Sequence, residues 1–168
     1  TTSTYSPGNL TGTSTIYCAV TSGSCGTHNT GSYTVTVDGN LTATLSGGSS
    51  PICYNTTPTT FTATAGGGTG SYTYLWYKNA SSTGVTSSTY SPGNLTATST
   101  VYCAVTSGSC GTQNTGSYTV TVDGNLTATL SGGSTNICYN TTPTAFTATG
   151  GGGTGSYTYL WYKDASST

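Results

Sequence analysis

The amino-acid sequence predicts an all-β protein in which one structural unit is repeated in tandem. The first observation is alternation, because apolar and polar side chains change places along residues 14–22 and 32–37, as in half-buried strands. The second is repetition, since Tyr5 recurs as Tyr90 and Trp76 as Trp161, at a period of 85 residues. The third is that no window places apolar residues at helical spacing.

The repeat divides the chain into one complete unit and two partial ones. Residues 39–123 form the complete copy, residues 1–38 repeat its closing part, and residues 124–168 repeat its opening part. The two windows of residues 4–83 and 89–168 are almost identical in sequence. They differ at eight positions: Gly12/Ala97, Ile16/Val101, His28/Gln113, Ser50/Thr135, Pro51/Asn136, Thr60/Ala145, Ala65/Gly150 and Asn79/Asp164.

The strands follow one another in the order of the alternating runs. After residues 14–22 and 32–37 we expect strands at residues 41–45, 61–65, 71–78, 101–105 and 118–122. The glycines at 66–70 predict a loop, and residues 79–87 are expected to hold at most a short edge strand.

The Asp38-Gly39 dipeptide lies between two alternating runs and allows two interpretations. Asp-Gly is a strong hairpin signal, so the flanking strands could pair directly. We favour a joint between repeats, because turn residues concentrate at this point of the period.

The composition excludes several classes of partner. Charged residues are 3% of the chain, against about 25% in an ordinary soluble domain, and the net charge is −1. The chain therefore lacks the basic surface that nucleic-acid binding needs. No apolar run reaches the roughly 18 residues of a membrane span, so we expect no membrane insertion. Aromatic residues at 11%, in alternating runs, argue for a folded chain rather than a disordered one.

The sequence offers no catalytic, cofactor or metal site. Gly150-x-Gly152-x-x-Gly155 matches a dinucleotide fingerprint by letter, but a strand follows it instead of the required helix. His28 is the only candidate base and is replaced by Gln113 in the second copy. Six residues separate Cys18 from Cys25, which is longer than the short Cys-x2-Cys spacing of a zinc site. We expect neither an enzyme nor a cofactor.

Asparagines followed by x-Ser/Thr are frequent, so covalent glycans are a second kind of expected partner. These candidate glycosylation sites are Asn9, Asn40, Asn55, Asn79, Asn94, Asn125 and Asn140.

Four segments resemble the tandem immunoglobulin-like repeats of large secreted surface and adhesin proteins of Bacteroidota. They are ICYNTTPTTFTAT, GGGTGSYTYLWYKN, TYSPGNLTATSTVYCAVTSGSC and SYTVTV. The resemblance covers the whole chain and implies immunoglobulin-like β-sandwiches with Trp76 and Trp161 as core anchors, in an extracellular setting. Two features depart from the pattern: the gap from Cys53 to Trp76 is long, and Val101 stands where a corner tyrosine is expected.

Six cysteines are candidates for disulfides, which suits an oxidising, extracellular compartment. They are Cys18, Cys25, Cys53, Cys103, Cys110 and Cys138. On the resemblance we expect Cys53 to pair with Cys103 or Cys110, and a Cys103–Cys110 hairpin bridge is the alternative. A bond from Cys138 to Cys18 or Cys25 of a neighbouring chain would lock an assembly covalently.

Placed on that fold, the first and last segments each hold only part of a sandwich. An open sheet with an uncovered apolar face is unstable and adhesive, so we expect the tail of one copy to complete the head of the next. The sequence therefore predicts a subunit of an extracellular filament or surface stalk, made of separate chains or of one long chain. The alternative function is an adhesin module in which Tyr17, Tyr77 and Tyr102 bind sugars.

Overall fold

The computed structural model describes residues 2–164 and 166–167, and its regular structure confirms the all-β prediction. Within these residues the only helices are two short 3-10 turns, η1 (Gly23–Cys25) and η2 (Gly108–Cys110). Residues 1, 165 and 168, which belong to the two predicted partial units, lie outside the described part of the chain. No described helix is long and apolar enough to cross a membrane.

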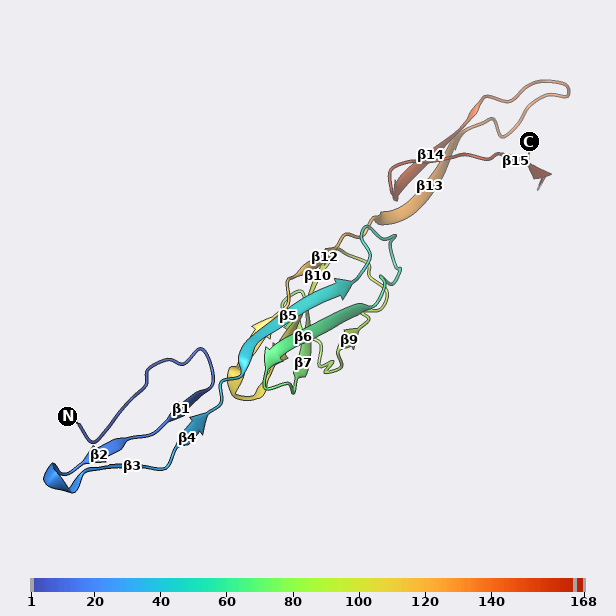
Figure 1. Ribbon diagram of the computed structural model, residues 1–168. Coiled ribbons are helices and arrows are strands. Elements are labelled where there is room, and N and C mark those ends of the chain that lie inside the picture. The colour runs from blue at the N-terminus through green and yellow to red at the C-terminus, as the bar shows by residue number, and fades with distance from the viewer. Residues whose placement is uncertain (1, 165, 168) are drawn as a thin grey trace.

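Two antiparallel sheets form the middle of the molecule, which we call the central unit (residues 39–123; Figure 1). The first sheet has the order β5-β6-β9, and the second has the order β11-β10-β7-β8 with β12 also paired to β10. Their bounds are β5 Gly39–Gly47, β6 Phe61–Gly68, β7 Thr73–Lys78, β8 Ser81–Ser82, β9 Thr89–Tyr90, β10 Ser99–Thr106, β11 Thr112–Asn114 and β12 Tyr118–Val120.

The buried core lies between these two sheets. Alternation explains it, because β10 buries every second residue from Ser99 to Val105 and turns the others outward. Among the residues whose burial the structure describes, the buried hydrophobic ones all belong to the central unit: Leu41, Phe61, Ala63, Trp76, Tyr90, Leu95, Val101, Cys103, Val105 and Val120. The largest of them is Trp76, which is fully buried.

We call residues 2–38 the head segment. Its strands form a long antiparallel hairpin, and η1 lies at the turn of this hairpin. Its strands are β1 (Ser14–Ile16), β2 (Ala19–Thr21), β3 (Thr27–Asn29) and β4 (Tyr33–Val35). Ser14 pairs with Val35, as Ser99 pairs with Val120 one period later. The head segment therefore keeps the register that the central unit uses between β10, β11 and β12.

Residues 124–164, the tail segment, repeat the β5-β6 hairpin. The pair is β13 (Gly124–Gly132) and β14 (Phe146–Gly153), followed by β15 (Tyr162–Lys163), which pairs with β16 (Ser166–Ser167). Gly124 pairs with Gly153 and the register shifts before Thr127, as it shifts after Gly39 in the central unit. Both hairpins thus carry the same bulge.

Strand lengths differ from the sequence prediction where a neighbouring strand is missing. The strand predicted at residues 14–22 is broken into β1 and β2, whereas its counterpart β10 is continuous and pairs with β7 along its length. Likewise β7 shrinks in the tail segment to β15. The predicted glycine loop at 66–70 is also corrected, because Gly66 and Gly68 are paired within β6 and the loop begins after them.

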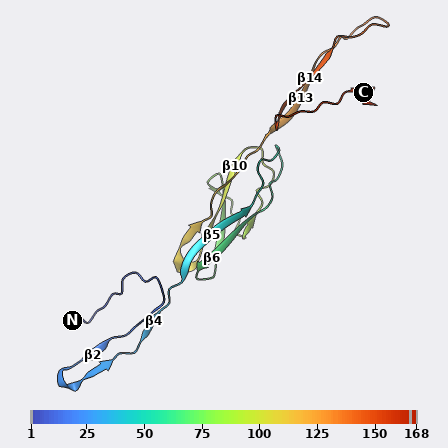
Figure 2. The ribbon, with the colours of Figure 1, turned by 45° about the horizontal axis from the view of Figure 1, so that its top comes forward.

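The chain changes partners at Asp38, as the joint interpretation expects. β4 pairs with β1 before this residue, and β5 pairs with β6 after it. The described ladders contain no β4-β5 pair, so the rival Asp-Gly hairpin is not formed. Both views show the two hairpins projecting from opposite ends of the central unit (Figures 1 and 2).

Candidate subunit interface

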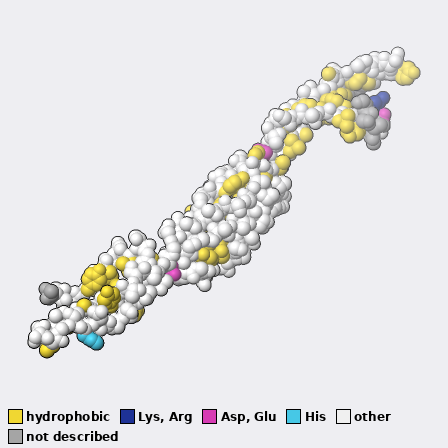
Figure 3. Space-filling model, viewed as in Figure 1, with side chains coloured by type: hydrophobic (Ala, Val, Ile, Leu, Met, Phe, Trp, Pro, Cys, Tyr) yellow, Lys and Arg dark blue, Asp and Glu magenta, His cyan; other side chains and the backbone are white. Residues whose placement is uncertain are grey.

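Several side chains that are buried in the central unit have exposed counterparts in the head and tail segments, and the remaining counterparts are half-buried. Leu41 is 7% exposed and its counterpart Leu126 is 66% exposed. Tyr90 is 8% exposed, against 76% for Tyr5. Figure 3 shows the same contrast, with hydrophobic side chains gathered on the two ends and a mostly white central body. Two apolar surfaces, one at each end, are therefore open to solvent.

A seam in the central unit shows how such surfaces fit together. The seam joins residues 39–83, which the tail segment repeats, to residues 84–123, which the head segment repeats. Its main part is the antiparallel ladder of β7 with β10, from Val101–Lys78 to Thr106–Thr73. The β6-β9 pair and the Thr56–Leu95 and Ile52–Val122 bridges complete it. The seam is thus made of backbone hydrogen bonds as well as of core packing.

Trp76 is the centre of the packing across the seam. Its ring stacks on Tyr90, with ring centroids 5.4 Å apart, and it lies opposite Cys103 in the β7-β10 ladder. Its indole Nε1–H donates to the backbone oxygen of Ser87 at 2.8 Å, so the one polar atom of the buried ring is paired. Phe61 from the same half packs edge-on against Tyr118 from the other half, at 5.5 Å.

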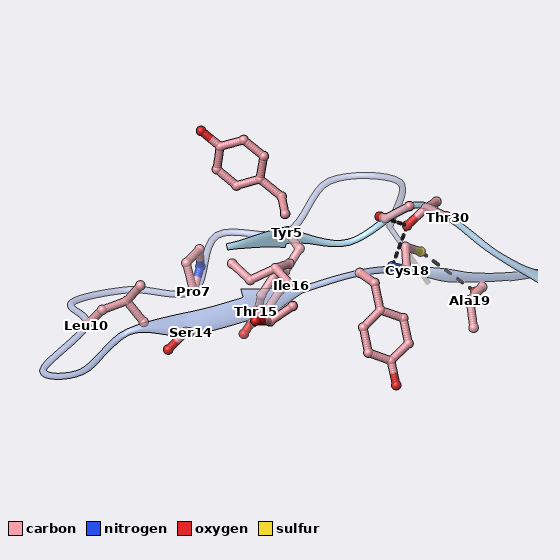
Figure 4. A pocket seen from close by; sticks show the side chains of 12 residues that line it. Tyr5, Pro7, Leu10, Ser14, Thr15, Ile16, Cys18, Ala19 and Thr30 are labelled. Atoms are coloured by element: carbon pink, nitrogen blue, oxygen red, sulfur yellow. Dashed lines mark hydrogen bonds between the residues drawn. The ribbon is translucent and has the colours of Figure 1, made fainter. Parts of the chain in front are cut away.

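The head segment presents the matching half of this arrangement as an open cavity. Its lining includes Tyr5, Leu10, Ile16, Cys18 and Tyr33, and Figure 4 shows most of these side chains with the Thr30–Cys18 hydrogen bond. They are the counterparts, one period earlier, of residues in the core cluster that contains Trp76 and Phe61. The cavity is therefore lined by residue types that pack around a buried aromatic ring in the central unit. We call the residues of this lining the socket residues.

The tail segment presents the complementary surface. Every residue of β13 is exposed, whereas β5 buries Leu41 and half-buries Ala43 and Leu45. Phe146 and Trp161, the counterparts of Phe61 and Trp76, are 49% and 41% exposed. The predicted core anchor Trp161 is thus only partly covered in the single chain, whereas Trp76 is fully buried as an anchor should be.

Local hydrogen bonds in the two end segments already match those of the central unit. The Cys18 N–H donates to Thr30 Oγ1 at 2.9 Å, as the Cys103 N–H donates to Thr115 Oγ1. In the tail, Tyr157 donates to the Gly152 oxygen at 2.7 Å, the bond that Tyr72 makes to Gly67. Part of each end segment therefore already has the local structure of the complete unit.

No disulfide joins any of the six cysteines, so the pairings expected for Cys53 and the alternative Cys103–Cys110 bridge are not formed. For Cys53 and Cys110 the reason is their position in the sandwich. Cys53 lies beside the start of β10, where Ile52 contacts Val122, and Cys110 lies on η2 beyond its end. The eight residues of β10 separate these ends by about 23 Å, and a disulfide needs Cα atoms within about 7 Å.

Burial affects two titratable groups in the central core. Burial raises the pKa of the Cys103 thiol, with a smaller opposing effect from a backbone hydrogen bond at Leu75. Burial also raises the pKa of the Tyr90 hydroxyl. Both groups are therefore neutral in the folded protein at physiological pH.

The seven candidate glycosylation asparagines are all exposed. Asn79 and Asn94 already make structural hydrogen bonds through their side-chain oxygens, to the Thr100 N–H and the Thr57 hydroxyl respectively. The other candidates are Asn9, Asn40, Asn55, Asn125 and Asn140. Glycosylation stays a prediction at all seven positions.

The tyrosines of the alternative sugar-binding surface are not brought together as one platform. Tyr77 and Tyr102 stack on one another, with ring centroids 4.8 Å apart and planes 2° from parallel. Tyr17 lies on the head segment and is 63% exposed. Each of the two stacked rings uses one of its faces on the other ring, and that face is closed to a sugar.

Sequence reasoning found the tryptophans but missed the socket residues, among them Tyr5, Leu10 and Tyr33. The alternation of residues 32–37 was a signal for Tyr33, whereas Tyr5 and Leu10 lie outside any alternating run and only the structure shows that their counterparts Tyr90 and Leu95 are buried. His28, the only histidine, lies on exposed β3. No group of three or more His, Cys, Asp or Glu side chains that could hold a metal occurs among residues that the structure describes.

Comparison with known families finds a match to part of the chain. Residues 42–124 match a family described as a domain of unknown function, DUF8696. The matched window nearly coincides with the central unit, and its description carries no activity. No curated protein matches the chain.

Proposed function

We propose that this chain is a structural subunit of an extracellular bacterial filament or surface stalk, assembled head to tail. The observation that carries the proposal is the pair of end surfaces described above. The tail segment repeats one side of the central seam, the head segment repeats the other, and each exposes several of the side chains that the central unit buries there. The partner that fits each surface is a second copy of this chain.

The central unit serves as the template for the composite unit formed by two copies. On this template Trp161 of one copy enters the head cavity of the next and stacks on its Tyr5, as Trp76 stacks on Tyr90. Residues 158–163 then pair with residues 16–21 of the next copy, and β1 and β2 join into one continuous strand. The composite unit gains both a core and a backbone ladder, which is strand addition in trans.

The placement of the two surfaces favours an open assembly. They lie at opposite ends of the molecule and differ from one another (Figures 1 and 2), so the contact is heterologous. A heterologous contact whose rotation does not close a ring repeats without limit and produces a filament.

The strand order of the central unit supports an immunoglobulin-like unit. The β5-β6-β9 sheet matches the A-B-E order of such sandwiches, and the β11-β10-β7-β8 sheet matches their G-F-C order with an added short edge strand. A charge content of 3% leaves hydration to hydroxyls, amides and glycans on the exposed asparagines, which suits a secreted fibre.

Electron microscopy of two related chains tests the proposal. The 168-residue chain, kept in a reducing buffer, is expected to form filaments as its concentration rises. The matched control is a permuted chain in which residues 39–168 are followed by Gly-Val, as at positions 84 and 85, and then by residues 1–38. Because it supplies its own missing half, it is expected to remain monomeric. Filaments from both chains, or from neither, would contradict the proposal.

A further inference from the structure

We propose that disulfides across the joints between successive units make the filament covalent. Cys53 of one copy bonds Cys25 of the next copy, and Cys138 bonds Cys110 of the next copy. This inference rests on the proposed head-to-tail assembly and adds to it a specific pairing and a redox dependence.

We call the end of a unit that meets the next joint along the chain its leading end, and the end that meets the preceding joint its base. The first thiol of each pair lies at the leading end of a unit. Ile52 accepts a hydrogen bond from the Asp123 N–H at 2.9 Å, which holds the exposed Cys53 beside the joint. Cys53 also lines a cavity at this joint together with Gly153 and Thr154 of the tail segment. Cys53 therefore faces the base of the following unit rather than its own core.

The second thiol of each pair lies at the base of a unit. Cys110 Sγ is 4.0 Å from Asp38 Oδ2, at the joint that precedes the central unit. The turn that carries it is fixed from the other half of the unit, because Ser107 Oγ accepts a hydrogen bond from the Thr69 N–H at 3.0 Å. Gly68 lies against the same side chain, where an added Cβ would approach Ser107 Oγ to 2.5 Å.

The repeat brings these two positions to one place. Asp38 and Asp123 are equivalent residues, and each joint places one of them between two units. At the leading joint of one copy, Asp123 therefore holds Ile52 through its N–H and contacts Cys25 of the next copy through its carboxylate. In the central unit Thr69 donates a hydrogen bond to Ser107. By the same contact the Ser22–Cys25 turn of the next copy packs against Gly153 and Thr154 of the first copy, and these two residues line the cavity that contains Cys53.

The same reasoning applies to the other joint. In the composite unit Ile137 takes the place of Ile52, so Cys138 lies beside Asp38 of the next copy. Cys110 of that copy is already in contact with this aspartate. Both pairs join different copies, so each head-to-tail contact carries two disulfides.

The pairing also accounts for three cysteines in each unit. Two of them lie at the joints, where they meet partners, and the third is Cys103, which is fully buried against Trp76. Its counterpart Cys18 becomes buried in the same way on assembly. These two stay as thiols because the core shields them from oxidants.

Formation of each bond needs an oxidant, which a small-molecule disulfide such as oxidised glutathione supplies. One cysteine thiolate attacks this disulfide, forms a mixed disulfide and releases one glutathione thiol. The second cysteine thiolate attacks the mixed disulfide and releases the other thiol. Two protein thiols are oxidised, two glutathione thiols are produced and two electrons are transferred in total.

The test starts from filaments assembled with reductant, which is then replaced by oxidised glutathione. Non-reducing gel electrophoresis is expected to show a ladder of covalent multimers that dithiothreitol abolishes. Peptide mass mapping is expected to find Cys53 linked to Cys25 and Cys138 linked to Cys110. Cys53→Ser together with Cys138→Ser should remove the ladder and leave the filaments. Cys53→Ser alone is the matched control and should retain the ladder, because the bond from Cys138 to Cys110 of the next copy remains.

Failure of this inference can be told from failure of the proposed function. Filaments that form with reductant but give no ladder after oxidation, or a ladder with other cysteine pairs, overturn the disulfide assignment alone. No filaments under either condition overturn both.

Discussion

Trp76 and Trp161 are the same residue of the repeat in two surroundings, which makes them a matched pair for mutation. Trp161→Ala removes the anchor of the proposed contact and leaves the central core intact. Truncation of a buried aromatic residue costs about 3–5 kcal/mol, so head-to-tail affinity is expected to fall by about 10² to 10⁴-fold. Sedimentation measures the affinity, and near-ultraviolet circular dichroism checks that the central unit stays folded.

Trp76→Ala is the control, and it should instead unfold the central unit, because this side chain is fully buried within one chain. Assembly of the Trp161→Ala chain at the wild-type concentration would contradict the role given to Trp161.

Gly67 of β6 lies opposite the bulge of β5, in a conformation and at a distance that leave no room for a side chain. Its φ is +67°, and a Cβ there would lie 2.0 Å from the backbone oxygen of Asn40. Gly67→Ala is therefore expected to lower the free energy of unfolding of the central unit by about 2 kcal/mol or more, measured by urea denaturation. Gly70→Ala has a similar φ of +81° but meets no atom within 4 Å, so about 1 kcal/mol is expected. Equal effects would show that the contact with Asn40 is unimportant.

The raised pKa values of Cys103 and Tyr90 predict that the central unit loses stability in alkali. The unfolded chain releases these protons from their ordinary pKa values of 9.0 and 10.0, while the folded chain retains them to higher pH. The stabilisation is complete below about pH 9 and is lost as the pH rises through the folded pKa values.

Urea denaturation from pH 7 to 11 measures this loss. Cys103→Ala should move the start of the decline upward, toward the range in which Tyr90 titrates. An unchanged onset would show that the Cys103 thiol does not contribute.

At the scale of elements, the head hairpin is expected to change its accessibility on assembly. Cys18 is exposed in the single chain, and its counterpart Cys103 is buried by β7 in the central unit. Iodoacetamide should therefore modify Cys18 quickly in monomers and slowly in filaments, while Cys103 reacts slowly in both. Mass spectrometry of the alkylated peptides measures the rates. Equal rates for Cys18 in the two states would mean that the tail does not cover β1 and β2.

The strands also show how far sequence alone predicts this structure. Alternation located β10 and β7, since their inward residues bury the core. The same alternation occurs in residues 14–22, yet the strand breaks there because only one of its edges is paired, by β4 and β3, and no counterpart of β7 pairs with the other edge. Strand length thus depends on a partner that a local pattern does not contain.

For the whole molecule, the period of the sequence was the most informative signal. It located the joints at Asp38 and Asp123, and the offset of one period relates exposed end residues such as Tyr5 and Leu126 to the buried residues Tyr90 and Leu41. The resemblance suggested disulfides within one sandwich, but Cys53 and Cys110 lie at opposite ends of β10. That separation is a property of the tertiary fold, so spacing along the chain could not reveal it.

The central claim is that two copies complete a unit equivalent to residues 39–123. A cryo-electron microscopy structure of the assembled chain tests it most directly. We expect Trp161 of one copy to stack on Tyr5 of the next at the separation of Trp76 and Tyr90, 5.4 Å between ring centroids. A map in which the head and tail of one molecule fold together, or in which copies join through other surfaces, would contradict the account.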